Sequence, residues 1–122
     1  MKKFVLLALV LTLVLVMSGC FLFNKKPVVE SIEISGSGME VTLTLSVSDP
    51  DNDPLTVEID WGDNNSDEFS EVTTGTVEAT HTYSGEDTYD VVITVSDGKA
   101  VVTLPTLKLN IPFQSESVIL NF

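Results

Sequence analysis

Several residue types are scarce in this 122-residue chain, and each scarcity excludes a class of function. Cys20 is the only cysteine, so no disulfide forms within the chain. His81 is the only histidine, so a zinc or other transition-metal site lacks its usual ligands. No serine motif accompanies His81, and Cys20 lies at a processing site, which argues against a nucleophilic triad.

Basic side chains are scarce as well. The chain has six lysines, no arginine and eighteen acids, and all the acids follow Cys20. From Cys20 onward four lysines remain, which gives this part a formal net charge of −14. Such a surface repels phosphate backbones, so we expect no nucleic-acid partner. It attracts cations, although solubility alone is a second explanation for the acids.

The first twenty residues have the order of a secretory signal. A basic pair precedes residues 4–16, which are apolar apart from one threonine. The stretch Met17-Ser18-Gly19-Cys20 resembles a bacterial lipobox, in which the cysteine is lipid-modified and becomes the mature N-terminus. This pattern predicts a lipoprotein signal peptide over residues 1–19, lipidation at Cys20, and a linker over residues 20–27.

An uncleaved signal anchor is the alternative for the same segment. Phe4 to Phe23 spans twenty residues, and as a helix with a rise of ~1.5 Å per residue it would cross a bilayer about once. In both cases the membrane is a partner, and the chain is tethered outside the cytoplasm. We therefore predict a location in the cell envelope, on its periplasmic or surface face. With lipid on Cys20, the residue that follows it, Phe21, favours the outer membrane of a diderm bacterium.

From Val28 onward, apolar and polar residues alternate with a period of two, as in strands with one buried face. Turn residues separate these runs, and valine and threonine, which favour strands, are abundant. The pattern indicates an all-β, Ig-like, two-sheet antiparallel sandwich of about seven strands over residues 28–104. Residues 105–122 form an extension, either an extra edge strand or a cover over the core. The predicted strands are 28–34, 40–48, 55–61, 67–72, 75–83, 88–96 and 99–104.

Three motifs stand at the ends of these strands. Asp60-Trp61-Gly62-Asp63 closes the third, His81-Thr82-Tyr83 closes the fifth, and an alternating run extends from Tyr89 to Asp97. In this order they resemble the D-F-G-D, H-x-Y and V-x-D motifs of the PKD (polycystic kidney disease-type) domain, an Ig-like module of surface proteins. The resemblance covers about residues 28–104 and implies a sandwich fold. It implies an architectural role for Asp60, Trp61, Gly62, Asp63, His81, Tyr83 and Tyr89.

The loop Asp49-Pro50-Asp51-Asn52-Asp53-Pro54 has two interpretations. An EF-hand is excluded, because a proline stands where that loop requires glycine. In some bacterial PKD domains, aspartates of this loop and of the V-x-D motif hold calcium. The resemblance therefore implies a calcium site at Asp49, Asp51 and Asp97, in which Asp53 assists or replaces one of them. The alternative is a solvated β-turn whose aspartates cap the backbone.

Catalysis is not expected from this chain. Glycoside hydrolysis requires two carboxyl groups across a cleft, one with a raised pKa, and exposed aspartates on a small sandwich do not provide them. We predict a non-catalytic module for contact with an envelope protein or a glycan, with no required cofactor. The alternative function is a calcium-dependent adhesion or carbohydrate-binding module.

Overall fold

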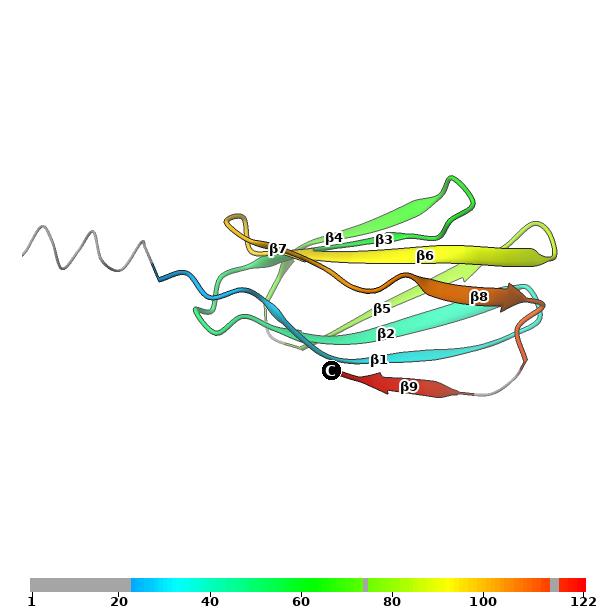
Figure 1. The fold of residues 1–122 in the computed structure, drawn as a ribbon, viewed down its shortest axis with the longest axis horizontal. Helices are drawn as coiled ribbons and strands as arrows, with labels where there is room; N and C mark the ends of the chain where they lie inside the picture. Colours follow the sequence, from blue (N-terminus) through cyan, green and yellow to red (C-terminus); the bar gives the residue numbers. More distant parts are fainter. Residues whose placement is uncertain (1–22, 74, 115–116) are drawn as a thin grey trace, which may run out of the picture.

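The computed structural model describes residues 23–73, 75–114 and 117–122, which form two antiparallel β-sheets packed face to face (Figure 1). No helix occurs among these residues, so the predicted all-β sandwich is confirmed. The strands are β1 (Val28–Ser37), β2 (Glu40–Ser48), β3 (Leu55–Asp60), β4 (Ser66–Val72), β5 (Gly75–Thr82), β6 (Asp87–Ser96), β7 (Val101–Thr103), β8 (Leu107–Ile111) and β9 (Val118–Asn121).

Two short strands, β7 and β8, pair with the same long strand, β6. One sheet has the order β5-β2-β1-β9 and the other β4-β3-β6-β7, while β8 also pairs with β6. The first half of β6 pairs with β8, with Tyr89 opposite Leu109, and the second half pairs with β7, with Val95 opposite Val102. Consequently β7 and β8 lie one after the other along the same side of β6 (Figure 1).

The core lies between the sheets because alternate residues of each strand face inward. In the β3–β6 pair, Val57 lies opposite Val95 and Ile59 opposite Ile93, and each side chain is at most 1% exposed. Burying one such side chain contributes about 1.5–3 kcal/mol, so packing holds the sheets together without a disulfide. Trp61, at the end of β3, is also fully buried.

The described residues contain nine strands, whereas the alternation pattern indicated about seven. The two additional strands, β8 and β9, lie in the segment that Pro105 and Pro112 interrupt. β9 pairs with β1, with Leu120 opposite Ile32, and forms one edge of its sheet. The first strand also runs farther than expected, to Ser37, and the seventh is limited to three residues.

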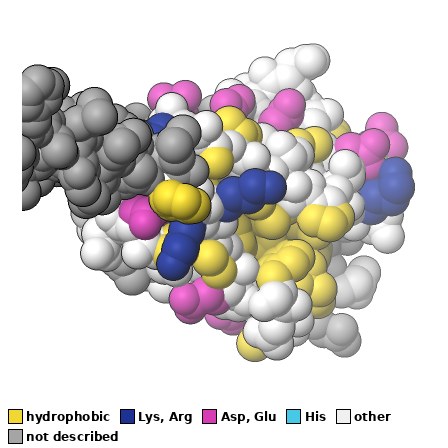
Figure 2. Space-filling model, turned by 60° about the vertical axis from the view of Figure 1, so that its left-hand side comes forward, with side chains coloured by type: hydrophobic (Ala, Val, Ile, Leu, Met, Phe, Trp, Pro, Cys, Tyr) yellow, Lys and Arg dark blue, Asp and Glu magenta, His cyan; other side chains and the backbone are white. Residues whose placement is uncertain are grey.

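The predicted signal segment and Cys20 lie outside the described residues. Within the described ranges, no helix has the length and apolar character needed to span a membrane. Figure 2 shows acidic side chains around the rim of one face and hydrophobic side chains gathered in its middle. A hollow of about 360 Å³ opens beside β8 and β9, lined in part by Leu109, Phe113 and Val118.

Candidate metal centre

Two acidic loops lie at opposite ends of β3. The β2–β3 loop, residues 49–54, precedes the strand, and the β3–β4 loop, residues 61–65, follows it. Because β6 runs antiparallel to β3, Asp97 at the end of β6 lies at the same end of the sandwich as the β2–β3 loop. The sequence motifs are thus divided between two separate sites.

In the β3–β4 loop, the carboxylates bond to the loop's own backbone. Asp60 Oδ1 accepts the N–H of Gly62 at 3.0 Å, and Asp63 Oδ1 accepts the N–H of Asn65 at 3.2 Å. Gly62 has a φ of +81°, and a Cβ there would collide with the carbonyl of Asp90. Glycine is therefore required at this position.

An aromatic cluster anchors this loop to the opposite sheet. His81 Nε2 on β5 lies 2.7 Å from Asp63 Oδ2, and its ring stacks on Trp61 with centroids 4.9 Å apart. The Tyr83 hydroxyl donates to the Trp61 carbonyl at 2.9 Å, and the Tyr89 hydroxyl donates to the Gly85 carbonyl at 2.9 Å. The Trp61 indole in turn donates to Asp67 Oδ2 at 2.9 Å.

Two residues of this cluster have shifted pKa values, one because of hydrogen bonds and the other because of burial. Burial alone would raise the pKa of Asp63, but hydrogen bonds with His81 and Asn65 outweigh it and hold the pKa below its usual value. Burial, and secondarily the charge of Asp63, raises the pKa of Tyr83. Tyr83 therefore stays a neutral hydrogen-bond donor.

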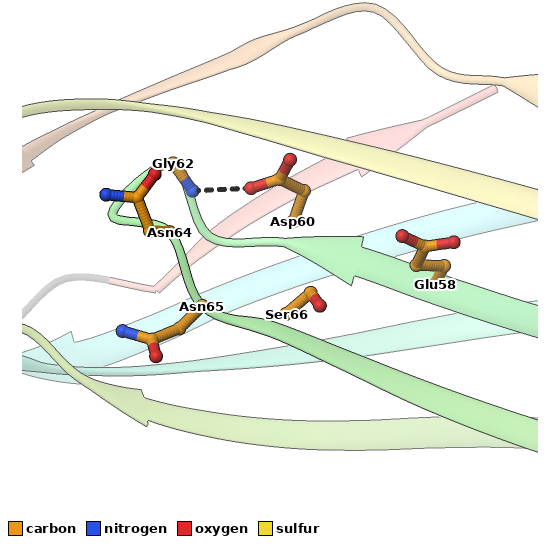
Figure 3. Close-up of a pocket in the computed structure, with 6 residues that line it drawn as sticks. All are labelled: Glu58, Asp60, Gly62, Asn64, Asn65 and Ser66. Carbon is orange, nitrogen blue, oxygen red and sulfur yellow. Dashed lines mark hydrogen bonds between the residues drawn. The ribbon is translucent and has the colours of Figure 1, made fainter.

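A polar hollow of about 310 Å³ lies on the outer side of the same hairpin, lined by Glu58, Asp60, Gly62, Asn64, Asn65 and Ser66. Figure 3 shows the Asp60 carboxylate turned toward the Gly62 amide, which it already binds. The hollow is open, and both of its carboxylate-bearing residues, Glu58 and Asp60, are exposed. It lacks the enclosure that a hydrolytic site requires.

At the other end of β3, Asp49 organises the β2–β3 loop. Its Oδ1 accepts the N–H groups of Asp51 at 2.8 Å and Asp53 at 3.2 Å, which is the geometry of an aspartate-capped turn. Asp49 is only 5% exposed, yet its second oxygen, Oδ2, has no hydrogen-bond partner. A buried carboxylate oxygen without a partner is energetically costly.

Asp97 faces this loop from the β6–β7 turn. Its Oδ1 accepts the N–H groups of Lys99 at 2.8 Å and Ala100 at 2.6 Å, and its Oδ2 accepts the side-chain amide of Asn24 at 2.8 Å. Burial would raise the pKa of Asp97, but the hydrogen bonds from Ala100 and Asn24 predominate and hold the pKa below its usual value. Asp97 is thus ionised at neutral pH.

Three carboxylates converge at this end. One oxygen from each of Asp49, Asp53 and Asp97 lies within 4.8 Å of the other two. Within the described ranges, three buried side-chain oxygens accept no hydrogen bond, and all belong to this neighbourhood: Asn24 Oδ1, Asp49 Oδ2 and Asp53 Oδ2. Asp51 is outside the group, because it is exposed and its Oδ2 accepts the backbone N–H of Lys25 at 2.7 Å.

The arrangement suits calcium. Calcium takes oxygen ligands at about 2.3–2.6 Å, so two ligands on opposite sides of the ion are about 4.6–5.2 Å apart. The oxygens of the three carboxylates lie no farther apart than such a pair can be. The ligands are all oxygens, which favours a hard cation over zinc. A cation would compensate the partnerless oxygens and the repulsion among the carboxylates.

The sequence profile of the PKD domain matches residues 24–111, most of the chain. The chain belongs to this family. No curated protein matches it. PKD domains are generally non-catalytic accessory modules that take part in protein or carbohydrate contacts.

Two solved PKD structures are similar in fold. One is the PKD domain of an M14-like peptidase from Thermoplasmatales archaeon SCGC AB-540-F20, with a TM-score of 0.58 and 24% identity, covering 73% of this chain and 98% of that one. The other is the PKD1 domain of Vibrio anguillarum Epp, with a TM-score of 0.57 and 23% identity, covering 74% of this chain and 100% of that one. At this identity the likeness establishes the fold alone.

Asn24 is the candidate site residue that the sequence did not reveal. It lies in the predicted linker, twenty-five residues or more from every acid of the site, and nothing in its local sequence marks it as a ligand. Only the fold brings its amide to Asp97, 73 positions along the chain. The signal that identifies it is therefore three-dimensional.

Proposed function

We propose that the protein is a cell-envelope lipoprotein that presents its PKD domain as a non-catalytic module for contact with a protein or a glycan. The family match carries this proposal, because PKD domains are accessory modules. The predicted lipidation at Cys20 supplies the tether. Exposed hydrophobic residues at the C-terminal edge, Val118, Ile119 and Phe122, offer a contact surface.

Membrane attachment is tested on the full chain expressed in a diderm bacterium. We expect a diacylglycerol adduct on Cys20 by mass spectrometry of the membrane fraction, and release of the protein when Cys20→Ser is introduced. An intact Met1 on membrane-bound protein would instead identify an uncleaved anchor.

Contact is tested by placing a photo-crosslinking amino acid at Ile119, which is 60% exposed on β9. Glu58, exposed on the outer side of β3, is the matched control position. We expect one defined adduct, protein or glycan, from position 119 and none from position 58. Equal adducts from both positions, or none from either, would contradict a contact surface at this edge.

A calcium-dependent module is the second candidate function, and the partnerless oxygens of Asn24, Asp49 and Asp53 favour it. We propose that Asp49, Asp53 and Asp97 bind calcium and that the Asn24 carbonyl oxygen adds a fourth protein ligand. The remaining coordination positions of calcium, which takes six to eight ligands, are left to water or backbone.

Titration calorimetry on the full chain in detergent tests this site. We expect one calcium per chain, with weaker magnesium binding because magnesium demands a near-ideal octahedron and dehydrates reluctantly. Asp97→Asn should weaken calcium binding at least tenfold, whereas Asp63→Asn at the opposite end should leave it unchanged. If calorimetry detects no calcium binding to the wild-type protein at millimolar calcium, the site is refuted.

A further inference from the structure

The segment that leads into the domain, residues 24–27, is fixed to the candidate calcium site; we call it the tether. The Asn24 amide donates to Asp97 Oδ2 at 2.8 Å, and the Lys25 backbone N–H donates to Asp51 Oδ2 at 2.7 Å. Pro27 is buried, and β1 begins at the next residue, Val28. The tether therefore packs onto the domain before the first strand begins.

The partnerless oxygens are distributed across separate segments. Asn24 Oδ1 belongs to the tether, whereas Asp49 Oδ2 and Asp53 Oδ2 belong to the β2–β3 loop. Asp97, which binds the Asn24 amide, belongs to a third segment, the β6–β7 turn. A cation that takes oxygens from these residues would connect all three segments at one point.

We propose that cation binding locks the tether onto the domain, and that loss of the cation releases it. The proposal rests on the calcium site proposed above and adds a role for that site in controlling how the domain is held. Without a cation, the close carboxylates repel each other, and the tether is held by the hydrogen bonds of Asn24 and Lys25 and by the buried Pro27. With a cation, Asn24 Oδ1 gains a ligand bond.

The size of the effect follows from linkage. A cation that binds both states, but the docked state more tightly, multiplies the ratio of docked to released tether by at most the ratio of its two dissociation constants. If the Asn24 ligand tightens calcium binding about tenfold, the released fraction falls about tenfold at saturating calcium. With lipid on Cys20, three residues separate the anchor from Asn24, and the four steps of chain between them span at most about 14 Å at ~3.5 Å per step. Locking the tether would therefore restrict the orientation of the domain against the membrane.

Limited proteolysis of the full chain in lipid vesicles with endoproteinase Lys-C tests the lock. The enzyme cuts after lysine, and cleavage between Lys25 and Lys26 requires the tether to leave the domain. Cleavage after Lys108, within β8, requires the sandwich itself to open and serves as an internal control. We expect the Lys25–Lys26 bond to be cut much faster than the Lys108 bond in chelator, and about tenfold more slowly at saturating calcium than in chelator.

Two substitutions at one position separate a metal ligand from a simple hydrogen-bond donor. Asn24→Ala removes the candidate ligand oxygen, so calcium should no longer protect the Lys25–Lys26 bond although it still raises the melting temperature. Asn24→Asp replaces the amide by a carboxylate, which repels Asp97 without calcium and binds calcium more strongly. The ratio of cleavage rates without and with calcium should therefore exceed the wild-type ratio in Asn24→Asp.

The outcomes distinguish this lock from the calcium site beneath it. A raised melting temperature with an unchanged rate of Lys25–Lys26 cleavage would overturn the lock and leave the calcium site standing. No change in melting temperature and no calorimetric binding would overturn both. If Asn24→Asp lost calcium protection as Asn24→Ala does, Asn24 would act only through its amide N–H, and the lock would be refuted.

Discussion

The two loops that flank β3 are both rich in aspartate, but they use their carboxylates differently. In the β3–β4 loop, Asp60 and Asp63 bond to backbone N–H groups, and Asp63 also pairs with His81. In the β2–β3 loop, Asp49 and Asp53 each keep an oxygen that is buried and without a partner.

The difference shows that the number of acids does not identify a binding site. Partnered carboxylates at one end stabilise a turn and anchor it to the opposite sheet, which needs no ligand. Partnerless buried oxygens at the other end cost free energy in the unliganded protein, and an oxygen-seeking cation would recover it. The following variants test this distinction, from the largest expected effect to the smallest.

Trp61→Ala should produce the largest loss, because the indole is fully buried at the β3–β4 end. We expect the free energy of unfolding to fall by about 3–5 kcal/mol in urea denaturation, equally with calcium and with chelator. Val101→Ala, at a 64% exposed position, is the control and should change it by about 0.5 kcal/mol or less. If calcium restored the free energy of unfolding lost in Trp61→Ala, the two ends would not be independent.

Calcium at 100 Kd should add about 2.7 kcal/mol to the free energy of unfolding, because it binds the folded state. Asp49→Asn keeps an acceptor for the loop N–H groups and removes the charge, so it should abolish most of this gain. Asp63→Asn, the matched change at the opposite end, should retain the full gain. Denaturation with calcium and with chelator measures the gain in the free energy of unfolding for each variant. Equal gains in both variants would contradict a calcium site at the β2–β3 end.

Tyr83→Phe leaves the Trp61 carbonyl without the hydroxyl that donates to it. Since this hydrogen bond is buried, we expect a loss of about 1–3 kcal/mol in the free energy of unfolding. Tyr89→Phe removes a less buried bond to Gly85 and should cost about 0.5–1.5 kcal/mol. An equal or larger loss in Tyr89→Phe would mean that Tyr83 does not anchor the hairpin.

Acidic pH should remove stabilising contributions at both ends of the sandwich. The folded-state pKa of Asp63 and of Asp97 lies below the ordinary value of about 3.9, so each contributes stability above that pH. This contribution disappears as the pH falls below about 4 and through the folded-state pKa. Asp63→Asn should therefore flatten the loss of stability between about pH 4 and pH 2 in pH-dependent denaturation with chelator present. An unchanged slope would show that the His81 contact does not favour the ionised carboxylate.

The fold could be predicted from the sequence because its information is local. Alternation in residues such as Val57 and Ile59 identifies a strand and its buried face without knowledge of its neighbours. For the extension that contains β8 and β9, the sequence leaves an edge strand and a cover over the core as alternatives, because two prolines break the pattern and β9 depends on pairing with β1, more than eighty positions away. Pairing over that distance leaves no periodic signal.

The candidate site was only partly predictable for the same reason. The sequence pointed to Asp49, Asp53 and Asp97, which the fold brings together, and to Asp51, which the fold turns toward the Lys25 amide. Alternating aspartates in a turn do not show which carboxylate faces the core. That depends on the hydrogen bonds of Asp49 to the loop backbone, which draw residues 51 and 53 around it.

The pairing of β9 with β1 determines where the chain's last residue lies. β9 runs antiparallel to β1, and the Phe122 N–H donates to the Glu30 carbonyl at 3.1 Å, two residues after β1 begins. A fluorescent protein or affinity tag fused after Phe122 would therefore emerge on the side of the domain that faces the tether. A tag inserted at Asn64, at the tip of the β3–β4 hairpin, would project from the far end and leave both the tether and β9 unobstructed.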